Sequence, residues 1–93
     1  ACPTGTDVVA ADGGTVTFAG YKGTFGYLVI IDHQNGMETY YAHNSELLVE
    51  EGDKVYKGYN IAEVGSTGRS TGPHCHFEIR VDGVPQDPME YLP

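Results

Sequence analysis

Two runs of β-forming residues on either side of an Asn-Gly pair restrict the possible folds of this chain more than any other feature. The first run, Tyr27 to Ile31, is continuous in apolar and β-branched side chains, which is typical of a strand buried on both faces. Asn35-Gly36 then precedes a second run, Met37 to Tyr41. Asn-Gly between two such runs is the strongest short-range indication of a β-hairpin. We therefore predict an antiparallel strand pair at the centre of the chain.

The other segments also favour short strands joined by turns. The chain has 13 glycines and 5 prolines in 93 residues, which indicates many turns. Further strands are predicted at Thr15–Ala19, Leu47–Val49, Lys54–Tyr56, Asn60–Val64 and Cys75–Val81, and one helical turn is predicted at Asp87–Leu92. No repeat or linker separates these segments. The sequence therefore predicts a single all-β domain, residues 1–93, built from antiparallel sheets.

The charge balance excludes one class of partner. The chain carries five Lys and Arg against thirteen Asp and Glu, a net charge of −8. Binding to a phosphate backbone needs a cluster of Lys and Arg side chains, so nucleic acid is not an expected partner. No apolar stretch is long enough to span a membrane, and none resembles a signal peptide. The sequence does not begin with Met, so we expect a processed product or a fragment.

The most informative motif is His74-x-His76, which follows a glycine-rich loop and opens the last long strand. Residues i and i+2 of a strand share one face and lie roughly 6.5–7 Å apart. One face of this strand carries His74, His76, Glu78 and Arg80, and the other, expected to face the core, carries Cys75, Phe77, Ile79 and Val81. This spacing allows one imidazole to bind a metal while the other reaches a nearby water. The alternative is that both histidines belong to a solvated strand face.

From the residues alone such a metal site is incomplete. Catalytic zinc uses three protein ligands and an open position, and here only His76 is placed to serve. His43 ends the predicted strand Tyr40–His43, so it is expected where the chain leaves the sheet and can line a cleft. His33 borders the hairpin turn and is predicted to be exposed to solvent. Cys2 and Cys75 are too few for a disulfide framework, and both a disulfide between them and two free thiols remain open.

Two other motifs resemble sites of different chemistry. The loop Gly65–Gly72 lacks the Gly-Lys-Ser/Thr ending and the following helix of a phosphate-binding loop. Its glycines are instead expected to let the backbone approach a substrate closely. Gly52-Asp53-Lys54-Val55 resembles half of the motif of biotinyl and lipoyl domains, in which a modified Lys lies at a hairpin tip. This carrier hypothesis rests on Lys54 alone.

Taken in order, five segments resemble the lysostaphin-type (LytM-like) zinc metallopeptidases that cut peptide cross-links in bacterial cell walls. The resemblance covers nearly the whole chain and is most specific in the last segment. The segments are Gly5–Ala10, Asp12–Val16, Tyr41–His43, Val49–Val55 and Gly65–Glu78.

This resemblance implies a fold, a cofactor and roles for three histidines. The implied fold is a barrel-sandwich hybrid of antiparallel sheets (a duplicated hybrid motif). His76 is implied as a zinc ligand, and His74 and His43 as the catalytic pair that does not bind the metal but acts on the attacking water and the transition state. Glu78, on the same strand face, is a possible partner of a ligand histidine. The implied substrate is a peptidoglycan peptide, so the expected location is extracellular or in the cell envelope.

The chain also departs from the family pattern. The family's other two zinc ligands belong to a His-x-Gly-x-Asp motif, which would lie just before Ala1, so we expect these two ligands upstream of this segment. Smaller departures are Cys75 in place of Leu, Asn44 in place of Leu and Asp7 in place of Pro. We predict a zinc endopeptidase domain for peptidoglycan that is inactive as this segment alone. The alternative is a metal-free relative that binds a cell-wall peptide or a protein.

Overall fold

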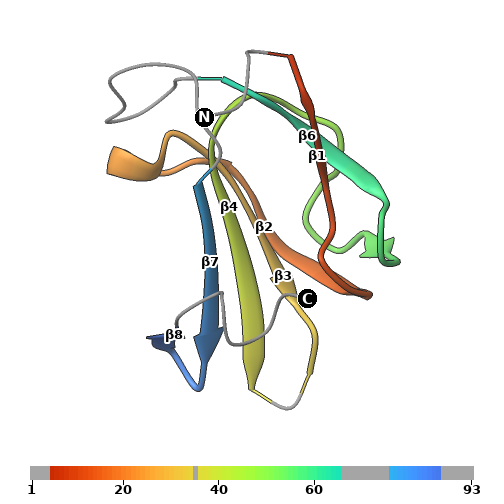
Figure 1. Cartoon of the computed structure of the whole chain (residues 1–93), viewed down its shortest axis with the longest axis vertical. Coiled ribbons are helices and arrows are strands. Elements are labelled where there is room, and N and C mark those ends of the chain that lie inside the picture. Colours follow the sequence, from red (N-terminus) through yellow and green to blue (C-terminus); the bar gives the residue numbers. More distant parts are fainter. Residues whose placement is uncertain (1–4, 35, 66–75, 87–93) are drawn as a thin grey trace.

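The computed structural model describes residues 5–34, 36–65 and 76–86 of the chain (Figure 1). These residues form eight strands and one short 3-10 turn, Gly23–Phe25. In chain order the strands are β1 (Asp7–Val9), β2 (Gly14–Tyr21), β3 (Tyr27–Asp32), β4 (Met37–Leu47), β5 (Lys54–Val55), β6 (Asn60–Val64), β7 (His76–Val81) and β8 (Val84–Gln86).

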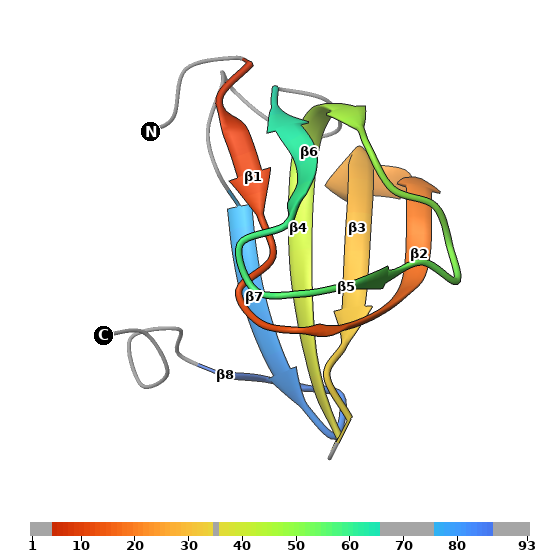
Figure 2. The same cartoon turned by 90° about the vertical axis from the view of Figure 1, so that its right-hand side faces the viewer.

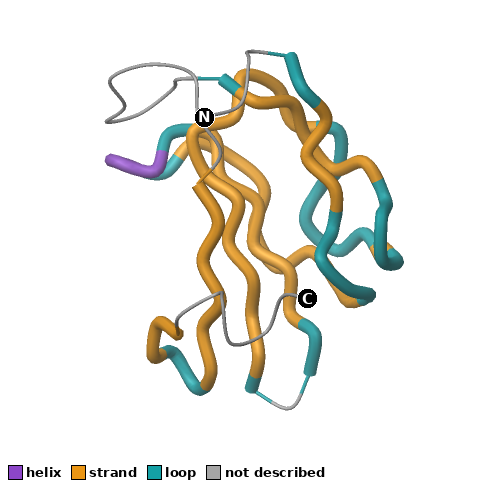
Figure 3. Tube along the Cα trace, in the orientation of Figure 1, coloured by secondary structure: helices purple, strands orange, loops and turns teal. Residues whose placement is uncertain are grey.

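All the strand pairs are antiparallel and belong to one branched sheet. The main order is β1-β6-β4-β3-β2-β5, while β7 pairs with β4 and β8 pairs with β7. The sheet curls, so that β2, β3, β4 and β7 form one layer and β1 and β6 lie across from it (Figures 1 and 2). Loops and the short strand β5 complete the second layer (Figure 3). The prediction of an all-β antiparallel fold is confirmed.

The central hairpin is also confirmed. β3 and β4 pair antiparallel, and the amide of Met37 donates to the carbonyl of Gln34 across the turn at 3.1 Å. Gly36 has a φ of 76°, a conformation in which glycine is favoured. The four residues from Leu28 to Ile31 are all buried, as expected for a strand covered on both faces.

Other element boundaries differ from the predictions. β4 continues to Leu47, so the expected strand Leu47–Val49 is mostly loop, and β1 and β8 were not predicted at all. Three-residue strands such as β1 and β8 are too short to show a periodic pattern of apolar residues. The predicted helical turn at Asp87–Leu92 lies outside the described residues.

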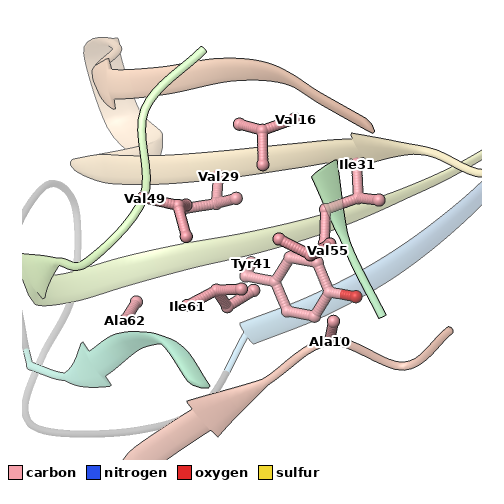
Figure 4. Close-up of a cluster of buried hydrophobic side chains, with 9 residues drawn as sticks. All are labelled: Ala10, Val16, Val29, Ile31, Tyr41, Val49, Val55, Ile61 and Ala62. Atoms are coloured by element: carbon pink, nitrogen blue, oxygen red, sulfur yellow. The ribbon is translucent and has the colours of Figure 1, made fainter. Parts of the chain in front are cut away.

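The apolar core has two parts, one on each face of the long strands. The larger part fills the space between the two layers, and Figure 4 shows its Tyr41 ring packed among aliphatic side chains. Its buried members are Ala10, Val16, Val29, Ile31, Tyr41, Val49, Val55, Ile61 and Ala62. The smaller part lies on the opposite face and contains Leu28, Ile30 and Ala42, with Phe18, Phe25 and Tyr40 packed against them.

Replacing Leu28 should test the second part of the core. Leu28 is completely buried, so Leu28→Ala should lower the free energy of unfolding by about 3 kcal/mol through lost burial and the cavity left behind. Leu48→Ala is the matched control, because Leu48 is 43% exposed and should lose less than about 1 kcal/mol. Urea unfolding of both variants gives the comparison, and equal losses would contradict this assignment of the core.

Candidate functional site

Strand β4 changes partner at His43. Along one edge, Met37 to Ala42 pair with β7, and from Asn44 onward the same edge pairs with β6. His43 is the residue between these two ladders. We call this point the β4 fork. The end of β6 and the start of β7 therefore both lie against this part of β4 (Figure 1).

A β-bulge sets the orientation of His43. In the ladder with β3, Tyr41 pairs with Val29 and Asn44 pairs with Tyr27, so Ala42 and His43 together stand opposite Leu28. His43 has a φ of 60°, in the left-handed region, and is only 7% exposed. A non-glycine residue in this conformation costs about 1–3 kcal/mol, which the surrounding contacts must offset. The register places His43 beside Ala42, which in turn stands opposite position 76 in the β4–β7 ladder.

The backbone around the fork is held from the β6 side by close packing. The amide of Gly65 donates to the carbonyl of His43 at 3.1 Å, and the hydroxyl of Ser45 donates to the carbonyl of Val64 at 3.1 Å. A Cβ atom at Gly65 would lie 2.5 Å from the amide nitrogen of Ser45. Any larger residue at position 65 would therefore push the two strands apart.

Of the three histidines implied by the family resemblance, two lie among the described residues. His43 lies at the fork, but within β4 rather than at its end as predicted, because the strand continues after the bulge. His76 opens β7 and pairs with Ala42, so its backbone lies next to His43 in the ladder. His74, Cys2 and Cys75 lie outside the described residues. The strand pairing thus brings the start of β7 and the end of β6 to the His43 segment of β4.

One face of β7 is apolar and the other is polar, as the alternation of residues predicts. Phe77 and Ile79 pack toward the larger core, with the rings of Phe77 and Tyr41 5.4 Å apart. On the other face, Nε and Nη2 of Arg80 donate to the same carboxylate oxygen of Glu78 at 3.1 and 3.0 Å. The guanidinium also lies 4.1 Å from the centre of the Tyr40 ring. The family resemblance suggests Glu78 as a hydrogen-bond partner of a ligand histidine. In the structure its carboxylate accepts from Arg80.

His33 is only partly exposed and not the free surface side chain that the sequence predicts, because both of its ring nitrogens are hydrogen-bonded to neighbouring segments. Nδ1 lies 2.7 Å from the carbonyl oxygen of Gly13, and Nε2 lies 2.7 Å from Oγ1 of Thr39. The Thr39 hydroxyl is 2.7 Å from the Tyr41 hydroxyl, which accepts from the amide of Ala11 at 3.0 Å. The sequence pattern missed this because the partners come from three separate segments.

These bonds form a chain with one direction, which we call the His33 relay. A carbonyl can only accept, so Nδ1 of His33 carries the proton and donates to Gly13. In the neutral ring Nε2 then accepts from Thr39, and Thr39 in turn accepts from Tyr41. Burial raises the pKa of Tyr41 and Asp12 adds to the rise, while the bonds to Ala11 and Thr39 oppose it. The relay joins the loop after β1 to strands β3 and β4.

The described residues also contain a cavity. A cavity of about 170 Å³ lies beside the relay, on the core side of β7, and is lined by Ala11, Asp12, His33, Met37, Thr39, Phe77 and Ile79. Within residues 5–34, 36–65 and 76–86, no group of three His, Cys, Asp or Glu side chains is arranged to hold a metal. Nor does the same part of the chain contain a helix that is long and apolar enough to cross a membrane. Lys54 lies in β5 opposite Thr15, not at a hairpin tip as a carrier lysine would.

The sequence matches the model of one peptidase family. Residues 1–88 match Peptidase family M23, and the chain therefore belongs to this family. The resemblance to lysostaphin-type peptidases is thereby confirmed.

Individual relatives agree with this assignment. The chain is 52% identical over 89 residues to the DD-carboxypeptidase/endopeptidase Mpg of Neisseria meningitidis serogroup B, covering 96% of this chain and 20% of that protein. It is 52% identical over 91 residues to a lipoprotein NlpD/LppB homolog of Pseudomonas aeruginosa, covering 96% of this chain and 30% of that protein. The chain thus spans about a fifth to a third of the length of these relatives.

Solved structures show the same fold. The catalytic domain of the antimicrobial peptidase lysostaphin from Staphylococcus simulans superposes with a TM-score of 0.91 at 34% identity, covering 97% of this chain and 72% of that chain. A zinc containing peptidase from Vibrio cholerae superposes with a TM-score of 0.92 at 38% identity, covering 96% of this chain and 28% of that chain.

Interrupting the His33 relay should destabilise the fold. Thr39→Val removes the hydroxyl that links Tyr41 to His33, so each of these two side chains loses one hydrogen bond, and the free energy of unfolding should fall by about 1–3 kcal/mol. Tyr41→Phe should also destabilise, and the double variant should lose less than the sum of the two. A double-mutant cycle by urea unfolding measures the coupling. Additive losses would show that the relay does not act as a unit.

The raised pKa of Tyr41 predicts a loss of stability in alkali. Because the folded chain holds this proton more tightly than the unfolded chain, the contribution is present at neutral pH and is lost as the pH rises above about 10. Unfolding measured from pH 8 to pH 11 should therefore decline less steeply in Tyr41→Phe than in the unmodified protein. Tyr56→Phe is the control, because Tyr56 is 68% exposed. The stability of this variant should decline with pH as steeply as that of the unmodified protein.

Proposed function

We propose that this chain acts within a zinc-dependent endopeptidase domain that hydrolyses peptide cross-links of bacterial peptidoglycan. The observation that carries the proposal is the β4 fork, where a buried histidine in a left-handed conformation adjoins the first residue of β7. A backbone conformation of this cost is often found at functional sites. Membership of Peptidase family M23 and a relative named as a DD-carboxypeptidase/endopeptidase support this activity.

The proposed metal needs more ligands than the described residues provide. Catalytic zinc takes three protein ligands, and no such group occurs among the described side chains. In this proposal His76 is one ligand, and the other two come from residues that precede Ala1 in the full protein. A solved neighbour described as a zinc containing peptidase supports the choice of metal. In zinc peptidases generally, the ion activates a water and polarises the scissile carbonyl.

The chain's own histidines would then move protons. Imidazole is the side chain best suited to exchange a proton near neutral pH, and general acid–base catalysis contributes typically about 10²–10⁴-fold to a rate. His43 and His74 take these roles in our proposal. The strand pairing supports His43, because the bulge places it next to the ladder pair formed by Ala42 and position 76.

The proposed substrate also suggests where the protein works. Peptidoglycan lies outside the cytoplasmic membrane, so we propose an extracellular or cell-envelope location. A relative named as a lipoprotein is consistent with the envelope. The net charge of −8 disfavours nucleic acid as a partner and is compatible with a peptide substrate.

Zinc analysis of two proteins tests the proposal. The first is this chain, and the second is a longer form of the protein that also carries the segment proposed to precede Ala1. We expect one zinc per molecule and peptidoglycan peptide cleavage only in the longer form. In that form, His74→Ala should lower the cleavage rate by about 100-fold or more, with zinc content and melting temperature unchanged.

Two results would contradict the proposed activity. A longer form that binds no zinc and cleaves no peptide would favour the metal-free binding module instead, which binding of peptidoglycan fragments would then test. If His74→Ala unfolded the protein, the histidine would be part of the core and not of a catalytic site. Phe77→Ala serves as the structural comparison, because it removes a ring packed on Tyr41 and should lower stability without a specific effect on the reaction.

A further inference from the structure

Gly65 follows the last residue of β6 and packs directly against the backbone of β4 at the fork. It is buried, and a Cβ atom added to it would lie 2.5 Å from the amide nitrogen of Ser45 and 2.7 Å from the Cα atom of Ser45. Gly65 is not one of the glycines with a positive φ, so its backbone conformation alone does not call for glycine. What this position requires is therefore the absence of a side chain.

Ser45, the residue that Gly65 contacts, is an irregular point of the β4–β6 ladder. Asn44 pairs with Val64, and the next pair along the ladder is formed by Glu46, so Ser45 is an extra residue between the two pairs. An extra residue bends its strand and interrupts the ladder locally. The close packing of Gly65 thus falls where regular strand pairing does not fix the distance between β4 and β6.

The His43 segment of β4 is held from two sides. On the β6 side, the amide of Gly65 donates to the carbonyl of His43 at 3.1 Å, so the residue that packs on β4 is also bonded to it. On the β3 side, Nδ2 of Asn44 donates to the carbonyls of Tyr27 and Tyr41 at 3.0 and 2.9 Å. Because protein interiors are close-packed, a displacement of β6 at this point would also move the segment that contains His43.

The size of that displacement follows from the contact itself. An ordinary contact of a Cβ atom begins at 3.4 Å, so a Cβ atom placed 2.5 Å from the Ser45 nitrogen would have to move away by about 0.9 Å. The contacted atoms belong to the backbone, which cannot turn aside as the end of a flexible side chain can. A misplacement of about 1 Å can lower the rate of an enzyme by about 100-fold.

We propose that Gly65 is a positioning residue for His43, because its missing side chain sets the distance between β6 and β4 at the fork. Gly65 does not touch the reacting atoms and acts through the backbone of β4. The inference rests on the proposed function, since His43 is a catalytic residue only if the domain is a peptidase. Gly65 is also the first residue of the segment in which the family resemblance is most specific.

Kinetics of the longer form of the protein test this role with two glycine variants. Gly14→Ala is the matched control for Gly65→Ala, because a Cβ atom at Gly14 would press on a backbone atom in the same way, the carbonyl oxygen of Asp32, at the opposite end of the long strands. Both variants should lower the melting temperature. Only Gly65→Ala should lower kcat for a cross-linked peptide, by about 10- to 100-fold, with KM within about twofold and zinc content unchanged.

The NMR signals of the His43 ring provide a readout that does not depend on activity. In this chain they should shift in Gly65→Ala and stay unchanged in Gly14→Ala. Unchanged kcat together with unchanged His43 signals in Gly65→Ala would overturn the proposal, as would equal losses of kcat in the two variants. If the unmodified longer form proves inactive, the proposed function fails, and a His43 shift confined to Gly65→Ala would still support the positional effect of Gly65.

A double variant keeps the test decisive if Gly65→Ala does not fold. Adding Ser45→Gly removes one of the three atoms that the new methyl group would meet, so the double variant has more room at the contact. Its kcat should still lie below that of Ser45→Gly alone. Equal kcat values in the folded double variant and in Ser45→Gly would show that the side chain at position 65 does not affect the position of His43.

Discussion

A β-strand has two edges, yet β4 pairs with three other strands, so one of its edges must change partner along its length. β3 occupies one edge, while β7 and then β6 occupy the other. The backbone cannot keep a regular ladder through such a change, because β6 and β7 leave in different directions (Figure 1). A bulge at Ala42–His43 and a second irregularity at Ser45 accommodate this change of partner.

The same constraint brings together residues that are distant in the sequence. A change of partner places the end of β6 and the start of β7 beside one residue of β4, and that residue is His43. Because of the extra residue in the bulge, Ala42 and His43 together stand opposite a single residue of β3. In a regular strand, neighbouring residues each have their own partner and their side chains point to opposite faces. The bulge thus accounts for the position of the histidine to which we assign a catalytic role in our proposal.

At the other end of the long strands, the His33 relay fixes the loop after β1 onto the sheet. Its groups come from the loop, from the β3–β4 hairpin and from β4, so it connects the two layers through hydrogen bonds where the larger core connects them through apolar packing. Small domains bury a limited fraction of their surface, and a fully satisfied buried network adds to the definition of a single packing arrangement. The glycine at position 65 and the buried Asn44 have a comparable role at the fork.

The sequence by itself determined the strand-rich class, the central hairpin, the strand Asn60–Val64 and the two faces of β7, because local propensity and a period of two are written in adjacent residues. The histidines at positions 43, 74 and 76 were also found from motifs, and their roles remain proposals. Tertiary structure alone decided that β4 continues through His43, that His33 is hydrogen-bonded inside the fold and that Asn44 spans the bulge. Each of these depends on partners from other strands, and the register of distant strands has no counterpart in the local pattern of a single chain.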